Sequence, residues 1–150
     1  MGKHQGIVLS RLYRLVGAAR DSTWLKEKYN MSIRRLRNAT NIPTEDLDDW
    51  GTPKTIGEPK CHLNGIQLIE NDDGSEGGIW ECTPGKFTRE IMQAEFTTFL
   101  TGRAIFHPEN GDPIEIVAGD VLFFPENSKG TWEIIETTRK AYFCYDLKER

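Results

Sequence analysis

The sequence predicts an all-β protein, a sandwich, jelly roll or barrel of short strands. Between residues 60 and 145, runs rich in β-branched and aromatic residues alternate with turns rich in Asn, Asp, Gly and Pro. Hydrophobic residues make up 37% of the 150 positions, which is enough for one domain with a buried core. We therefore expect a single β domain, preceded by a segment of different character.

Residues 1–43 are predicted to form a basic, partly helical N-terminal extension. Apolar side chains at positions 7–16 fall mostly at helical spacing, which indicates a short amphipathic helix. The first forty residues carry nine Lys and Arg against two acidic residues, whereas the remainder carries ten against 21. This segment could dock on the acidic body or on a partner. Nucleic acid is not an expected partner, because the segment lacks the alternating aromatic and basic residues of a surface that binds single-stranded nucleic acid.

The β domain is predicted over residues 44–150. Its first part contains Pro53 and Pro59, which disfavour helix. Residues 44–50 could form one capped turn, with Trp50 packing onto the barrel. Such a leader would cover a sheet face or edge that otherwise invites pairing with another chain.

The strands follow from the turn residues that separate them. Asn, Asp and Gly accept the backbone angles that turns require, and Pro sets the entry to a turn. The candidate strands are residues 61–70, 78–83, 88–92, 96–101, 103–107, 114–117, 121–124, 130–135 and 140–145. Because side chains alternate along a strand, Lys140 and Tyr142 share one face of the last strand, opposite Arg139 and Tyr145. The alternation alone leaves open which of these pairs faces inward.

Glu95 with Gly102, and Gly119 with Pro125, form two short patterns that resemble the metal-binding motifs of the cupin superfamily. Glu95, six residues and Gly102 match the second half of the first cupin motif. Gly119, five residues and Pro125 match the start of the second motif. The resemblance implies a cupin jelly-roll β-barrel.

A wider resemblance covers residues 44–145. The segments 78–87, 130–133 and 139–142 resemble single-domain cupins grouped with (S)-ureidoglycine aminohydrolase, a group to which the ethanolamine-utilisation protein Q also belongs. This resemblance favours Lys140 and Tyr142 as the inward pair. It also implies pairing into a homodimer, and the apolar face of the N-terminal segment needs a surface to bury against.

The histidines that hold a cupin metal are missing from both motifs. The positions of the first pair fall on Arg89 and Ile91, or on Thr88 and Glu90, and the later position falls on Gly130. We therefore expect no metal site and no cofactor. Glu90 and Glu95 alone would hold a hard cation only weakly.

Glu95 has two interpretations. As a functional carboxylate it would face the barrel interior, where burial would raise its pKa and suit it to acid or base catalysis. As a structural carboxylate it would pair with Arg89 or Arg103. We favour the functional interpretation, because the family places this side chain in its cavity.

The predicted site combines an acid or base with cationic and aromatic groups. The candidate catalytic residues are Glu95, Lys140 and Tyr142, of which the last two could stabilise an anionic group or a developing oxyanion. Cys82 could be a nucleophile, although a small buried apolar side chain is its more common role. Plain core packing remains an alternative for the aromatic members. The candidate substrate-binding residues are Trp80, Cys82, Arg89, Glu90, Phe99, Phe124 and Trp132.

Two functions fit these residues. The first is metal-independent acid–base chemistry, of hydrolase or isomerase type, on a small polar metabolite. The second is a non-catalytic module that binds a small ligand or regulates a partner. Three cysteines without a Cys-x-x-Cys pair favour reduced thiols and a cytoplasmic location. No apolar run approaches the roughly 20 residues of a membrane span, so no membrane association is expected.

Overall fold

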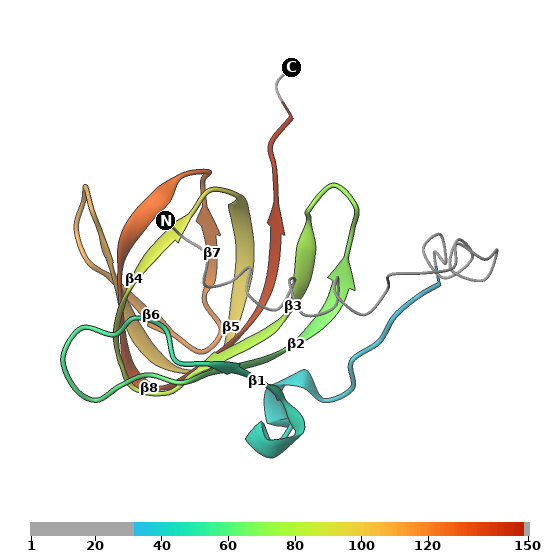
Figure 1. The fold of residues 1–150 in the computed structure, drawn as a ribbon, viewed down its shortest axis with the longest axis horizontal. Coiled ribbons are helices and arrows are strands. Elements are labelled where there is room, and N and C mark those ends of the chain that lie inside the picture. The colour runs from blue at the N-terminus through green and yellow to red at the C-terminus, as the bar shows by residue number, and fades with distance from the viewer. Residues whose placement is uncertain (1–31, 149–150) are drawn as a thin grey trace, which may run out of the picture.

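The computed structural model describes residues 32–148, and their regular structure is almost entirely β. Two short 3-10 turns, η1 (Ala39–Asn41) and η2 (Thr44–Asp46), precede the strands (Figure 1). No helix in this part of the chain has the length and apolar character needed to cross a membrane. The strands are β1 (Asp48–Gly51), β2 (Leu63–Glu70), β3 (Glu76–Cys82), β4 (Gly85–Ile91), β5 (Ala94–Pro108), β6 (Ile114–Val117), β7 (Val121–Phe124) and β8 (Ser128–Tyr145).

The two long strands hold the architecture together. β5 and β8 pair antiparallel over most of their length, and the sheet order is β1-β2-β3-β8-β5-β6. β4 joins the first half of β8, and β7 joins the first half of β5. Because both long strands bend, the sheet folds over on itself and encloses a core (Figure 1). The expected all-β jelly-roll fold is confirmed.

The sequence divided each long strand into two. Residues 96–101 and 103–107 belong to β5, and residues 130–135 and 140–145 belong to β8. At Gly102 the pairing shifts its register, and the residue has a φ of 90°. A glycine there lets the strand bend without ending, so the predicted boundary is a bend.

Aromatic rings fill the centre of the core. The Trp132 ring lies 5.0–6.1 Å, centroid to centroid, from the rings of four other buried aromatic residues. These are Trp80, Phe99, Phe106 and Phe124. Trp50 packs against this core, as the sequence predicted. It lies over Gly65, where an added Cβ would be 2.3 Å from the Trp50 ring.

The segment before β1 lies against the outer face of the sheet. Arg139 on β8 is buried there and donates hydrogen bonds to the backbone oxygens of Ala39, Thr40 and Ile42 at 2.7–3.1 Å. The same guanidinium binds the Glu81 carboxylate, with Nε 2.9 Å from Oε2. The leader thus covers a sheet face, while the helix predicted within residues 7–16 lies outside the described residues.

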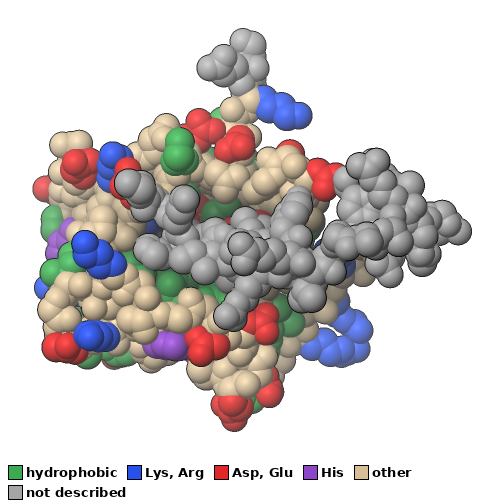
Figure 2. Space-filling view, in the orientation of Figure 1, with side chains coloured by type: hydrophobic (Ala, Val, Ile, Leu, Met, Phe, Trp, Pro, Cys, Tyr) green, Lys and Arg blue, Asp and Glu red, His purple; other side chains and the backbone are tan. Residues whose placement is uncertain are grey.

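Acidic side chains are prominent at the edge of the molecule formed by this leader. Glu45, Asp46, Asp48 and Asp49 are exposed around η2 and β1. Figure 2 shows acidic side chains at the lower edge of the view, where Figure 1 places the segment around η2. The surface of the described region therefore has the acidic character that its composition predicted.

Candidate functional site

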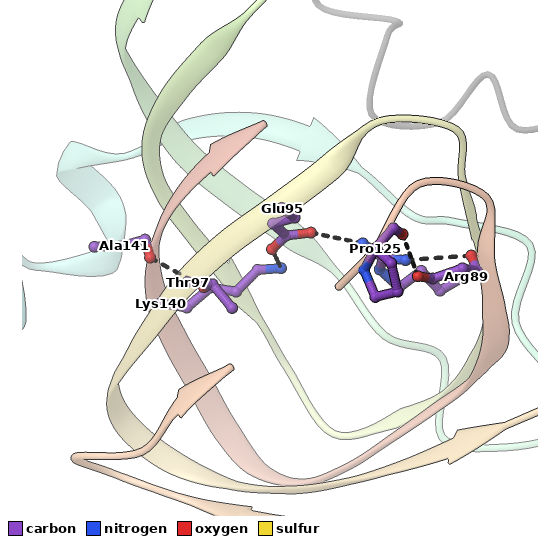
Figure 3. Close-up of polar contacts among 7 residues, drawn as sticks. Arg89, Glu95, Thr97, Pro125, Lys140 and Ala141 are labelled. Carbon is purple, nitrogen blue, oxygen red and sulfur yellow. Dashed lines mark hydrogen bonds and ion pairs between the residues drawn. The ribbon is translucent and has the colours of Figure 1, made fainter. Parts of the chain in front are cut away.

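The most unusual feature of the core is a cluster of three charged side chains. Glu95 on β5 is fully buried and lies between Arg89 on β4 and Lys140 on β8 (Figure 3). Arg89 Nη2 is 2.8 Å from Glu95 Oε2, and Lys140 Nζ donates to Glu95 Oε1. The side chains of both cations are at least 98% buried. We refer to Arg89, Glu95 and Lys140 as the charged triad.

Strand alternation and register explain how the triad forms. Lys140 lies opposite Trp80 on β3 and opposite Phe99 on β5, so its side chain projects among the central aromatic rings. Glu95 pairs with Cys144, four residues farther along β8. The long lysine side chain therefore extends along its strand to reach the carboxylate. The inward pair of β8 is Lys140 with Tyr142, because Arg139 faces the leader on the other side.

Burial and the neighbouring cations act on Glu95 in opposite directions. Burial alone would raise the pKa of this carboxyl group, but the Lys140 ammonium and the Arg89 guanidinium outweigh burial and lower it. The expectation of a raised pKa is therefore wrong. Glu95 does face the interior, yet it also pairs with Arg89, as the structural interpretation proposed. Arg103, the other partner considered, is exposed.

The triad carries one positive charge in excess. Each cation also lies over an aromatic ring: the Arg89 guanidinium is 4.1 Å from the centroid of Phe124, and Lys140 Nζ is 4.8 Å from that of Trp80. Such contacts stabilise a desolvated cation but accept no conventional hydrogen bond. Arg89 Nη1 reaches the backbone oxygen of Ser128 at 3.3 Å, whereas its Nε has no hydrogen-bond partner among the described residues.

The neighbouring hydroxyl and thiol groups are neutral. Burial raises the pKa of Tyr142 strongly, and it raises that of Cys144 to about 12. Burial also raises the pKa of Cys82, whose thiol donates to the Thr83 backbone oxygen at 3.3 Å. A neutral buried thiol is a poor nucleophile, so Cys82 serves best as a small core side chain. The Tyr142 hydroxyl makes no hydrogen bond within residues 32–148.

Glu90 is not brought to the triad. It follows Arg89 on β4 and therefore points to the opposite face, where its carboxylate lies 3.1 Å from Lys129 Nζ. This pairing lowers the pKa of the half-exposed Glu90 carboxyl. The expectation that Glu90 contributes to the site is wrong, because strand alternation separates it from Glu95. The aromatic candidates Trp80, Phe99, Phe124 and Trp132 do surround the cations.

One further carboxylate faces the interior and was missed. Glu76 on β3 pairs with Cys144, on the face that holds Tyr142 two residues away. Gln67 Nε2 donates to its carboxylate at 2.7 Å. The predicted strand begins at Gly78, so Glu76 lies outside it. Extending the alternation backwards from Trp80 would have found it.

The side chains at the motif positions do not fit a cupin metal. Within residues 32–148, no three His, Cys, Asp or Glu side chains are grouped as metal ligands. Both Glu95 oxygens accept hydrogen bonds from cations, which would repel a metal ion. His62 instead binds Asp49, and His107 binds Glu133. The side chain of each histidine is 40% exposed.

Comparison with known proteins identifies similar folds. A model of the EutQ-like cupin domain matches residues 69–142. No protein among those with curated descriptions matches the chain. A protein of unknown function from Pseudomonas syringae pv. tomato is similar in structure, with 22% identity and a TM-score of 0.59. The similarity covers 65% of this chain but only 43% of that protein, so the chain spans less than half of it.

Two ethanolamine-utilisation proteins share the fold as well. A putative protein Q from Salmonella typhimurium is 21% identical, with a TM-score of 0.51 over 58% of this chain and 72% of that one. The EutQ protein of Clostridium difficile is 16% identical, with a TM-score of 0.52 over 63% of this chain and 78% of that one. At these identities the likeness is one of fold. Together with the match over residues 69–142, it supports a cupin-type jelly-roll fold for this chain.

Proposed function

We propose that the barrel interior binds a small organic anion, a carboxylate, through Arg89 and Lys140. The observation that carries this proposal is the charged triad, in which two buried cations share one carboxylate. An isolated charge in a desolvated site is unfavourable, and an anionic ligand would neutralise the excess. Glu95 would hold the two cations in position, and the surrounding rings would exclude water.

Unpaired donors support a ligand that supplies hydrogen-bond acceptors. In the described part of the chain, two buried side-chain polar atoms lack a partner: Arg89 Nε and Trp50 Nε1. Both are donors. Lys140 Nζ has three hydrogens, yet Glu95 is its one hydrogen-bond acceptor among residues 32–148. Oxygen atoms of a carboxylate would give the Arg89 and Lys140 donors the acceptors that they lack.

The pKa of Glu95 favours binding over acid catalysis at this residue. A general acid at neutral pH needs a raised pKa, whereas the two cations lower that of Glu95. The carboxylate therefore remains ionised and holds its neighbours in place. Ureidoglycine hydrolysis, the activity of the enzyme that the sequence resembles, is a weaker proposal. Cupins of that kind use a metal, and the side chains here do not fit one.

Thermal unfolding in the presence of small carboxylates tests the proposal. Glycolate and succinate should raise the melting temperature of the full-length protein, and their neutral amides should not. Binding stabilises a protein by about 2.7 kcal/mol at a hundredfold excess of ligand over Kd. Arg89→Met should abolish the response, because a neutral Lys140–Glu95 pair remains.

Lys129→Met is the matched control, since it removes an exposed cation whose partner is Glu90. This variant should respond to glycolate as the wild type does. Stabilisation by the amides, or an undiminished response in Arg89→Met, would contradict the proposal.

A further inference from the structure

Two carboxylates face the interior at the same level of the barrel. Glu76 on β3 and Glu95 on β5 both pair with Cys144, which lies on the strand between them. Strands are spaced about 4.8 Å apart, so the two glutamate Cα atoms are separated by roughly 10 Å. Their side chains project to the same side of the sheet, toward Tyr142 and the triad.

The two carboxylates have different partners. Glu95 has two cations, whereas Glu76 has one neutral donor, the Gln67 amide. From β2, Glu70 pairs directly with Glu76 and adds a like charge. From β8, Tyr142 and Cys144 are its neighbours, and both are neutral. Burial, reinforced by Glu70 and Glu95, raises the pKa of Glu76 above the ordinary value of a glutamate.

We propose that Glu76 takes up a proton when the barrel binds its anion, so that a neutral carboxyl group lies beside the ligand. This inference rests on the anion site proposed above and adds a second function to it. The bound anion would bring another negative charge close to Glu76. Neither cation pairs with Glu76, so protonation is the available way to relieve the repulsion.

The position of Tyr142 also bears on this inference. Tyr142 is 92% buried, and its ring lies 6.0 Å from Lys140 Nζ, centroid to nitrogen. It lies two residues from Cys144 on the same face of β8, so it borders Glu76 and Lys140. A ligand held by Lys140 would therefore lie within reach of both a hydroxyl group and a protonated Glu76.

Because anion binding is coupled to protonation of Glu76, the affinity for the anion should fall as the pH rises. Binding raises the pKa of Glu76, so affinity is highest when this residue is protonated. As the pH rises through the interval between the free and bound pKa values, affinity falls by up to tenfold per unit. Glu95 stays ionised and Tyr142 and Cys144 stay neutral near neutral pH, so they do not produce this change. Glu70 is the other carboxylate facing Glu76.

Tryptophan fluorescence measures the effect on the full-length protein. Trp80 and Trp132 lie within 6 Å of Lys140 Nζ, so glycolate binding should change their emission. The Kd for glycolate, which remains ionised above about pH 5, is determined between pH 5 and 8. We expect the wild-type Kd to rise with pH. Glu76→Gln should give a constant Kd and bind more tightly than the wild type at pH 8.

Two other variants test whether other carboxylates contribute to the pH dependence. Glu70→Gln should keep the pH dependence but move it to lower pH, because one like charge is removed. Glu115→Gln, at an exposed position on β6, is the matched control and should behave as the wild type. If Glu76→Gln fails to fold, the Glu76 carboxyl is titrated by carbon NMR in the wild type. Its pKa should rise when glycolate is added.

The outcomes distinguish the two proposals. Glycolate binding with no pH dependence, or with a dependence unchanged in Glu76→Gln, overturns the role of Glu76 and leaves the anion site intact. No effect of glycolate in the wild type overturns both. A Glu76 pKa that stays constant when glycolate binds also overturns the coupling.

Discussion

At the scale of single residues, the interior is defined by how three charges balance. Burying the charges of Arg89 and Lys140 is unfavourable without a counter-charge, and Glu95 supplies one. The same contacts lower the pKa of Glu95. One carboxylate therefore contributes to stability and to the positioning of both cations.

Replacing this carboxylate should be costly. Glu95→Gln leaves two buried cations without a negative partner, so we expect the free energy of unfolding to fall by about 3–5 kcal/mol. Lys140→Met removes the excess charge and leaves a neutral Arg89–Glu95 pair, so it should cost less. Urea denaturation at pH 7 measures both. A Glu95→Gln variant as stable as the wild type would show that the triad does not stabilise the fold.

The sequence predicted which side chains face inward but not how they interact. Alternation and the family resemblance placed Glu95, Lys140 and Tyr142 inside. The sign of the Glu95 pKa shift was missed, because it depends on β4 and β8 converging on β5. Glu90 was assigned to the site for a related reason: without a fixed register, its face of β4 was unknown.

At the scale of elements, continuous strands replace several predicted breaks. β6 and β7 have the predicted bounds, because each is a short run between strong turn signals. β5 was divided at Gly102, which also resembles a turn signal in the sequence. A local pattern does not show whether a glycine ends a strand or bends it, since that depends on the paired strand.

Replacing Gly102 should destabilise the protein far more than replacing Gly119, a glycine with a similar φ. An added Cβ at Gly102 would lie 2.3 Å from the Thr137 backbone oxygen, whereas at Gly119 nothing lies within 4 Å. The φ values are 90° and 97°, so the two positions are matched in φ. We expect Gly119→Ala to cost about 1–2 kcal/mol and Gly102→Ala clearly more. Equal losses in urea denaturation would show that close packing at the bend is unimportant.

At the scale of the whole molecule, one sheet face has an apolar row that no segment within residues 32–148 covers. Phe96 on β5 pairs with Phe123 on β7 and with Phe143 on β8, so the three side chains lie side by side on the outer face. Their side chains are 53%, 52% and 37% exposed. Phe143 also stacks on Tyr145, with ring centroids 5.6 Å apart. An exposed row of this kind is typical of an interaction surface.

We propose that a second copy of the chain covers this row, forming the homodimer that the sequence led us to expect. The row contains no charged residue, so two copies can face each other about a twofold axis without like-charge repulsion. The net charge of −4 makes contact through acidic surfaces less favourable.

Light scattering should give the mass of a dimer for the wild type and of a monomer for Phe96→Glu. Val117→Glu, on the exposed face of β6, is the control and should remain dimeric. A version starting at Met31 separates this contact from any contribution of the basic N-terminal segment, because it too should be dimeric if the phenylalanine row alone is responsible.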